Sequence, residues 1–151
     1  MRNITVIKHF TGAPFFRIFG LGPNMIPVNA LNQLKILLQE NSFWAINREI
    51  KDLKNMLANS TIVITIWNNT KLIGFGRATS DSIYRAVLWD VIIAKKYQQN
   101  GLGKLLVNTL LDHNTIKNVE KIYLMTTNCK EFYESCGFRN IANQFVLIKA
   151  K

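Results

Sequence analysis

The segment Tyr84–Leu111 reads YRAVLWDVIIA over residues 84–94, then KKYQQN, then GLGKLLVNTLL over residues 101–111. The first part is rich in β-branched and apolar residues and predicts a strand. The last part repeats leucines at helical spacing and predicts a helix over 101–111. A further apolar run predicts a strand over 121–126. Because a helix separates these two strands, they must be joined by a crossover and lie parallel.

The residues before this unit predict two helices and a hairpin. Leucines at helical spacing indicate a helix over 31–40, and a second amphipathic pattern indicates a helix over 48–58. The β-branched runs at 61–67 and 71–78, joined by the turn Asn68-Asn69, indicate a hairpin. Together with the parallel pair, these elements predict an α+β fold with a mixed sheet.

The two ends of the chain give weaker patterns. A helix is predicted over 129–136, ended by Gly137, and a last strand is predicted over 144–148. Residues 1–30 sustain no period and are interrupted by glycine and proline, which predicts an irregular N-terminal extension. A length of 151 residues fits one globular domain, which we place at 31–151.

Two glycines stand where the helix over 101–111 begins. The first four N–H groups of a helix have no intrahelical partner and the dipole is positive there, so an anion suits this position. Gly101 and Gly103 allow close approach to the backbone. A P-loop is excluded because Leu105 stands where Ser or Thr is required, and a dinucleotide fingerprint is excluded because Leu106 replaces its third glycine.

The remaining pattern resembles a known family. The run QQNGLG, residues 98–103, follows an apolar strand and is similar to the pyrophosphate motif of the Gcn5-related N-acetyltransferase (GNAT) superfamily. The run FYESCGF, residues 132–138, resembles the closing motif of that family. The resemblance implies a GNAT fold, with a mostly antiparallel sheet whose central parallel pair is splayed around acetyl-CoA, flanked by helices. It also implies that 31–151 is an N-acetyltransferase domain.

The resemblance assigns roles to individual residues. It implies that the backbone N–H of Val91 faces the thioester carbonyl, that Ile93 binds the pantetheine arm, and that Tyr133 protonates the departing thiolate. Asp90, within an apolar strand, is a candidate base or amine anchor, with a structural hydrogen-bond acceptor as the alternative. No metal is implied. The implied cofactor-binding residues are Val91, Ile93, Gln98, Gln99, Asn100, Gly101, Leu102, Gly103 and Lys104.

Composition narrows the classes of partner. The formal net charge of +10 is compatible with an anionic cofactor, an acidic protein or nucleic acid. The cations are scattered, with no block of five or more, so the sequence does not favour nucleic acid as a partner.

No apolar run approaches the roughly 20 residues that span a bilayer, so no membrane association is expected. Cys129 and Cys136 lie in one predicted helix, too far apart for a disulfide, and are expected to be reduced.

A closer resemblance covers residues 43–148. The run IGFGRATSD from Ile73, together with LWDVII and the two motifs, resembles cyanobacterial and plastid acetyltransferases related to plant serotonin N-acetyltransferase. The implied activity is direct attack of a primary amine on the thioester of acetyl-CoA, with an arylalkylamine, a protein lysine or a protein N-terminus as acceptor. Thr126 stands where the plant arylalkylamine enzymes carry Asp. The alternative is therefore a catalytically weak module that binds coenzyme A or another protein.

Asn, Ile and Lys are abundant, which is typical of translation from an AT-rich genome such as that of an organelle or a reduced bacterium. The N-terminal residues show neither a signal peptide nor a transit peptide. With the resemblance, these features predict an organelle-encoded protein of the chloroplast stroma, with the bacterial cytoplasm as the alternative. The residues leave the amine acceptor and the oligomeric state open.

Overall fold

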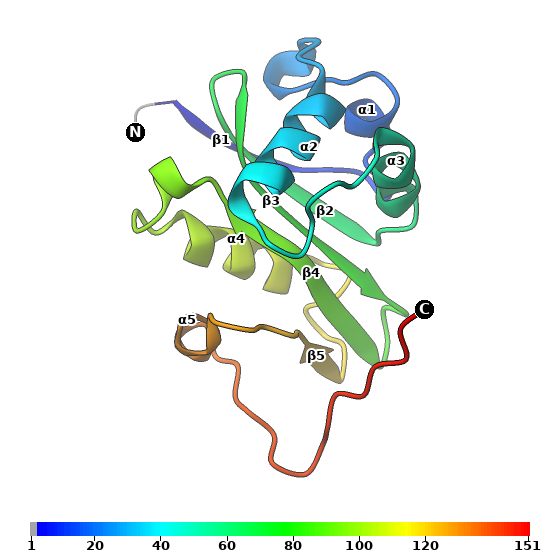
Figure 1. Ribbon diagram of the computed structural model, residues 1–151, viewed down its shortest axis with the longest axis vertical. Helices are drawn as coiled ribbons and strands as arrows, with labels where there is room; N and C mark the ends of the chain where they lie inside the picture. Colours follow the sequence, from blue (N-terminus) through cyan, green and yellow to red (C-terminus); the bar gives the residue numbers. More distant parts are fainter. Residues whose placement is uncertain (1–2) are drawn as a thin grey trace.

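A computed structural model describes residues 3–151, and its centre is a five-stranded sheet of order β1-β2-β3-β4-β5 (Figure 1). Neighbouring strands are antiparallel from β1 to β4, and β4 and β5 are parallel. The predicted mixed sheet is therefore confirmed. The strands are β1 (Ile4–Lys8), β2 (Ile62–Asn68), β3 (Lys71–Ser80), β4 (Arg85–Ile93) and β5 (Lys121–Tyr123).

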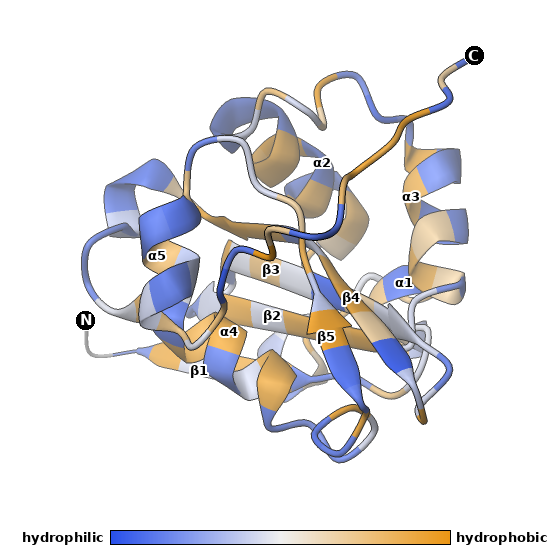
Figure 2. Ribbon diagram, turned by 90° about the horizontal axis from the view of Figure 1, so that it is seen from below, coloured by the Kyte–Doolittle hydropathy of each residue, from blue (hydrophilic) through white to orange (hydrophobic). Residues whose placement is uncertain are grey.

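Helices cover both faces of the sheet (Figures 1 and 2). One face carries α1 (Pro14–Arg17), α2 (Ala30–Asn41) and α3 (Ile50–Ala58), and the other carries α4 (Leu102–Leu111) and α5 (Lys130–Ser135). Two short 3-10 helices, η1 (Pro23–Met25) and η2 (Lys95–Tyr97), lie in the connections. None of the helices formed by residues 3–151 has the length and apolar character needed to cross a bilayer.

Alternation along the strands builds a separate apolar core on each face. Trp67 and Leu72 are buried on the side of α2 and α3. Ile66 and Ile73 are buried on the opposite side, against α4. Because successive strand residues point to opposite faces, the central strands must be apolar on both sides. This explains why β2 reads as a continuous apolar run rather than as an alternating one.

The prediction of an irregular segment over residues 1–30 is wrong for part of that range. Ile4–Lys8 forms the edge strand β1, which pairs with β2, and Phe16 in α1 is fully buried in the core. The strand is five residues long, too short to show a sustained period, and its partner is more than fifty residues away in sequence. The start of the domain at residue 31 stays a prediction.

The last predicted strand is also wrong. Residues 139–151, all of which the structure describes, contain no strand, and Phe145 and Leu147 are 84% and 90% exposed. Their β-branched and aromatic neighbours favour an extended backbone, but a strand also needs a partner to complete its hydrogen-bond ladder. The strand predicted over 121–126 is shorter than expected for a related reason, since β5 pairs with β4 over three residues only.

A buried polar cluster links β1 to β2 beneath α1. Thr65 Oγ1 lies 2.8 Å from Trp67 Nε1 and 2.7 Å from His9 Nε2. Since Trp67 can only donate, Thr65 accepts from it and can donate its own proton to a neutral His9. The His9 ring also packs edge-on against Phe16. Burial lowers the pKa of His9 from 6.5 to about 4, so this imidazole is neutral in the folded protein near pH 7.

Acidification should therefore destabilise the protein through His9. The folded state holds this group neutral, so its contribution to stability is complete above pH 6.5 and is lost progressively as the pH falls towards 4. The loss amounts to about 3 kcal/mol in the free energy of unfolding. Urea unfolding of the wild type and of His9→Gln between pH 7 and pH 4 measures it, and the variant should show a shallower decline. His113→Gln should change the slope less than His9→Gln does, because burial and the charge of Lys8 lower the pKa of His113 as well. Equal slopes for wild type and His9→Gln would contradict the expectation.

Candidate active site

The parallel strands β4 and β5 separate partway along the sheet. Their pairing begins at Arg85 with Lys121 and ends at Val87 with Tyr123. Beyond this point β4 continues to Ile93, whereas β5 has ended. Beyond Val87, β4 therefore pairs with β3 only, and the other edge of the strand is open. The predicted splayed parallel pair is present, but it lies at the edge of the sheet rather than at its centre, because β5 is the last strand and the strand predicted over 144–148 does not form.

The open edge carries the main-chain groups of Val91 and Ile93. Ala94 donates its N–H to the carbonyl oxygen of Ile73 on β3. Because backbone groups alternate between the two edges of a strand, the N–H of Ile93 points to the opposite, open edge, and so does that of Val91 two residues earlier. These are the two positions that the sequence analysis assigned to the thioester and the pantetheine arm.

Asp90 lies in a β-bulge directly before Val91. The register between β3 and β4 shifts between Phe75 and Arg77, so the segment around Asp90 is unmatched on β3. Asp90 itself has φ 53°, in the left-handed region that Asp tolerates better than most residues. Regular pairing resumes at Ile92 with Phe75 and Ile93 with Gly74, so Val91 lies between the bulge and the last paired residues of β4.

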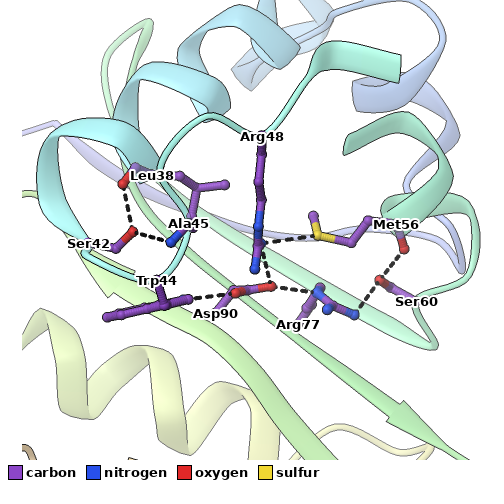
Figure 3. A network of polar contacts seen from close by, with 9 residues as sticks. All are labelled: Leu38, Ser42, Trp44, Ala45, Arg48, Met56, Ser60, Arg77 and Asp90. Carbon is purple, nitrogen blue, oxygen red and sulfur yellow. Dashed lines mark hydrogen bonds and ion pairs between the residues drawn. The ribbon is translucent and has the colours of Figure 1, made fainter. Parts of the chain in front are cut away.

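Three side chains donate to the Asp90 carboxylate (Figure 3). Trp44 Nε1 lies 3.1 Å from Oδ1, and Oδ2 is 2.9 Å from Arg77 Nε and 3.1 Å from Arg48 Nη1. Arg77 comes from β3, whereas Trp44 and Arg48 come from the loop between α2 and α3. The Asp90 side chain is only 5% exposed. The cluster therefore fastens that loop to the bulge of β4.

The electrostatics keep Asp90 charged. Burial acts to raise the pKa of Asp90, but hydrogen bonds and charge from Arg48 and then Arg77 outweigh it, so the pKa lies below its ordinary value. A carboxylate with two arginine partners and a lowered pKa is a weak proton acceptor. Of the two roles that the sequence left open for Asp90, these contacts favour the structural hydrogen-bond acceptor.

The segment after β4 leads into the N-terminus of α4. Gly101 is the N-cap of α4 with φ 79°, and no side chain caps the helix. The first helical hydrogen bond runs from the N–H of Leu105 to the carbonyl of Gly101, so the N–H groups of residues 101–104 precede the intrahelical ladder. These four groups, with the nearby ammonium of Lys104, form a site suited to a phosphate.

The side chains of Gln98 and Asn100 hold the loop rather than extend from it. Gln98 Nε2 donates to the carbonyl of Ile93 at 2.9 Å, and Asn100 Nδ2 donates to the carbonyl of Gln98 at 3.0 Å. Gln99 between them has φ 61°. The side chains of two predicted binding residues therefore shape the backbone, and main-chain groups remain for a ligand. Leu102 is buried against the sheet.

Gly103 brings the two sequence motifs together. A Cβ at this position would lie 3.2 Å from Cζ of Phe132, tighter than ordinary van der Waals contact. Phe132 belongs to α5, and it stacks edge-on against Tyr133. The first turn of α4 and the start of the closing motif thus touch through a position that only glycine fits without a shift.

Tyr133 is fixed by the end of α5. The N–H of Phe138 donates to the carbonyl of Tyr133 and the N–H of Gly137 to that of Glu134, which together form a Schellman motif. The rings of Tyr133 and Phe138 pack edge-on at 6.0 Å. Burial, and then electrostatic repulsion from the neighbouring Cys129 and Cys136, raise the pKa of Tyr133 to about 12. Tyr133 is therefore a protonated phenol throughout the physiological range, the form required of a proton donor.

Sequence analysis missed Trp44, Arg48 and Arg77 as partners of Asp90. Arg77 offered a signal, because it interrupts a strand whose neighbours are otherwise buried, and a buried cation calls for a counterion. Trp44 and Arg48 offered none, since their loop lacks a periodic pattern.

Thr126 stands where the plant arylalkylamine enzymes carry Asp. Its hydroxyl accepts a hydrogen bond from the N–H of Cys129 just before α5. Among residues 3–151, no three His, Cys, Asp or Glu side chains gather closely enough to hold a metal ion.

Comparison with known families gives a match over most of the chain. The model described as "Acetyltransferase (GNAT) family" matches residues 31–138. This range contains the bulge of β4, the N-terminus of α4 and Tyr133. The family match thus covers all the geometry described above.

Similar curated proteins come from algae, cyanobacteria and plants. The N-acetyltransferase ycf52 of Pyropia yezoensis is 36% identical over 98 residues, which are 62% of this chain and 56% of that protein. A ycf52-like N-acetyltransferase of Prochlorococcus marinus is 35% identical over 113 residues, 72% of this chain and 62% of that protein. The GCN5-related N-acetyltransferase 2, chloroplastic, of Arabidopsis thaliana is 41% identical over 69 residues, 45% of this chain and 27% of that protein. The chain thus spans less than two thirds of the length of each of these relatives.

Solved structures share the fold at low identity. A GNAT-family acetyltransferase from Streptococcus pneumoniae superposes with a TM-score of 0.74 at 19% identity, covering 98% of both chains. The ribosomal-protein-S18-alanine N-acetyltransferase from Escherichia coli gives a TM-score of 0.65 at 18% identity, covering 92% of this chain and 79% of that one. The order of strands and helices is therefore one that acetyltransferases use.

Proposed function

The chain belongs to the acetyltransferase (GNAT) family, and from this premise we propose that it transfers an acetyl group from acetyl-CoA to a primary amine. The observation that carries the proposal is the open edge of β4, which is followed along the chain by the uncapped N-terminus of α4. A pyrophosphate at that N-terminus would leave its thioester arm free to run along the open edge. Both features lie within the range of the family match.

The residues present fit acetyl-CoA. When bound, acetyl-CoA supplies an acyl group activated as a thioester. The N–H groups of residues 101–104 and the Lys104 ammonium would hold its phosphates. The N–H groups of Val91 and Ile93 would hold the arm, and that of Val91 would stabilise the carbonyl oxygen as negative charge develops, a contribution worth roughly 3 kcal/mol. The loop side chains of Gln98 and Asn100 keep this backbone in place.

Tyr133 supplies the proton in this proposal. Its raised pKa, about 12, keeps the phenol protonated, and it lies on the helix that contacts the first turn of α4 through Phe132. The amine must arrive neutral or lose a proton, and the sequence left Asp90 as a candidate base or amine anchor, with a structural hydrogen-bond acceptor as the alternative. The three donors around Asp90 support a different role, in which it orders the bulge and the loop between α2 and α3.

The acceptor in this proposal is a protein amine or a small arylalkylamine, and the compartment is the chloroplast stroma. Support for the compartment comes from the chloroplastic GCN5-related relative in Arabidopsis thaliana. Support for a protein acceptor comes from relatives named for such substrates, among them the "Histone acetyltransferase TAP1" of Glycine max, 34% identical over 103 residues. A bacterial cytoplasm would suit the similarity to the Prochlorococcus marinus protein.

The test is release of free thiol from acetyl-CoA by the purified protein. The panel should contain an arylalkylamine, a lysine-containing peptide and a peptide with a free N-terminus, with calorimetry of acetyl-CoA binding in parallel. We expect binding, and thiol release with at least one amine. Binding without release across the panel would support instead a module that binds coenzyme A without turnover. Absence of binding would remove the basis of the proposal.

Gly103→Val should weaken acetyl-CoA binding at least tenfold, a change of about 1.4 kcal/mol. The added side chain meets Phe132, so the start of α4 and its N–H groups must shift. Isothermal titration calorimetry measures the change. Asn108→Val introduces the same residue on an exposed part of the same helix and should keep the wild-type affinity. Equal affinity of both variants would mean that the N-terminus of α4 does not hold the cofactor.

A further inference from the structure

A groove of about 400 Å³ lies beside α2, between the start of β3 and the segment that leads into η2. Its lining includes the apolar side chains of Leu37, Leu72 and Ile36. Leu37 and Leu72 are buried, whereas Ile36 is 45% exposed and offers apolar surface to a ligand. None of these residues belongs to the acetyl-CoA site described above. The groove is therefore a separate feature on the side of the sheet that carries α2.

Two amide side chains hold the walls of this groove in place. At one end, Gln33 Oε1 accepts the N–H of Leu72 at 2.8 Å, and its Nε2 donates to the carbonyl of Thr70. At the other end, Asn41 Oδ1 accepts the N–H of Lys95 at 2.9 Å. Because α2 is fastened to both of its neighbours, the groove exists before any ligand binds. Binding there would cost little conformational entropy.

The charge of the groove is positive. Lys71, Lys95 and Lys96 line it, and Glu40 is its single acidic residue. Within residues 3–151, none of these three lysines has a carboxylate within ion-pair distance. Three unpaired ammonium groups above an apolar floor match a segment that carries carboxylates and at least one apolar side chain.

The groove leads towards the reaction centre. Asn41, at its far end, is the last residue of α2, and the chain continues directly into Phe43 and Trp44, which are 59% and 46% exposed. Trp44 donates to Asp90 in the bulge before Val91. A chain lying in the groove would therefore continue over this loop to the open edge of β4.

We propose that this groove binds an acidic, extended segment of the polypeptide whose amine is acetylated. The inference rests on the proposed function, and it narrows the acceptor to a protein or peptide with carboxylates flanking the amine. The carboxylates contact Lys71, Lys95 and Lys96, and an apolar side chain of the segment covers Ile36. The amine then lies beside the open edge of β4, beyond Trp44.

A polypeptide fits this groove better than a nucleic acid does. Single-stranded nucleic acid needs aromatic platforms for its bases. The one aromatic residue that lines the groove itself is Tyr97, whose hydroxyl accepts a hydrogen bond from Asn68 and whose ring has the Lys96 ammonium over it, 6.0 Å from its centre. Glu40 would repel a phosphate backbone, whereas a peptide can set an uncharged residue next to it. The exposed apolar surface of Ile36 also has no counterpart in nucleic acid.

The test measures peptide binding without turnover. A fluorescein-labelled peptide of alternating glutamate and leucine is titrated with the wild type, with Lys71→Gln/Lys96→Gln, and with the control Lys51→Gln/Lys117→Gln, which removes the same charge elsewhere. We expect the groove variant to bind at least tenfold more weakly and the control to stay within twofold of the wild type. The peptide with glutamine in place of glutamate should bind at least tenfold more weakly than the original to the wild type.

Equal binding of the two peptides, or equal weakening by both double variants, would overturn the inference. So would tighter binding of a single-stranded oligonucleotide of the same charge that depends on the same two lysines. Calorimetry with acetyl-CoA distinguishes failure of the groove proposal from failure of the proposed function. A wild-type protein that binds acetyl-CoA but not the acidic peptide rejects the groove alone, whereas a wild-type protein that does not bind acetyl-CoA rejects the proposed function.

Discussion

Replacing Tyr133 by phenylalanine should lower kcat by roughly 10²-fold or more, the range found for loss of a positioned general acid. The substitution removes one hydroxyl group and keeps the ring. The edge-on contacts of Tyr133 with Phe132 and Phe138, and the Schellman motif that ends α5, do not depend on the hydroxyl. We therefore expect acetyl-CoA binding and the free energy of unfolding to stay close to those of the wild type. Single-turnover thiol release measures the effect.

Tyr84→Phe is the matched control for Tyr133→Phe. Tyr84 is 61% exposed in the turn between β3 and β4, and its loss should leave kcat unchanged. The pH dependence adds a second readout, because a phenol with a pKa of about 12 remains protonated across the usual assay range. If the wild-type kcat began to fall with rising pH already below pH 9, and this fall were absent from Tyr133→Phe, the raised pKa would be contradicted. An unchanged kcat in the variant would exclude Tyr133 as the acid.

The parts of the fold that sequence reasoning recovered are those with a strong local pattern. The helices at α2, α3 and α4 follow from leucines at helical spacing, and the hairpin of β2 and β3 follows from two β-branched runs around an Asn-Asn turn. The crossover between β4 and β5 follows from chain geometry, since a helix lies between the two strands. In each case the information lies within a few neighbouring residues.

The parts that it missed depend on partners far along the chain. β1 becomes a strand because β2, more than fifty residues away, offers an edge to pair with. The segment at 144–148 has a similar composition but no such partner among the residues that the structure describes, and it stays extended and exposed. Similar local propensities thus give opposite outcomes, because the ladder of backbone hydrogen bonds decides whether a strand forms.

The candidate site divides in the same way. The glycines at the start of α4 and Tyr133 could be found from motifs, because their geometry is set by the helices that they begin or end. The setting of Asp90 could not, because its three donors come from β3 and from a loop more than forty residues away. The sequence correctly marked Asp90 as needing a reason, but only the three-dimensional contacts supply that reason.

Asp90→Asn should destabilise the protein by about 3 kcal/mol, the low end of the cost of removing one partner from a buried ion pair. Asparagine keeps the shape of the side chain and tolerates the left-handed backbone of the bulge. It removes the charge, so Arg48 and Arg77 are left facing each other with no counterion. Urea unfolding at pH 7 measures the loss, and Asp52→Asn on the exposed side of α3 should change the free energy of unfolding by less than about 0.5 kcal/mol.

The dependence on pH has a defined sign. Because the folded state lowers the pKa of Asp90, its contribution to stability is present above the ordinary carboxyl pKa of about 4 and is lost as the pH falls below that value. Wild type and Asp90→Asn should therefore differ most at neutral pH and converge in acid. This window lies below that of His9, whose contribution is lost between pH 6.5 and about 4.

Kinetics then separate a positioning role of Asp90 from a role as the base. If Asp90 orders the loop and the bulge, Arg48→Met should reproduce part of the activity loss of Asp90→Asn. The combined variant should then lose less than the sum of the two, because both changes break one cluster. A base would behave differently. Asp90→Asn would abolish the fall of kcat at low pH, whereas Arg48→Met would shift that fall to a higher pH, by raising the pKa of Asp90, and leave the maximal kcat intact. The arginines beside Asp90 favour the first outcome, because a carboxylate that already accepts three hydrogen bonds has little basicity left for an incoming amine.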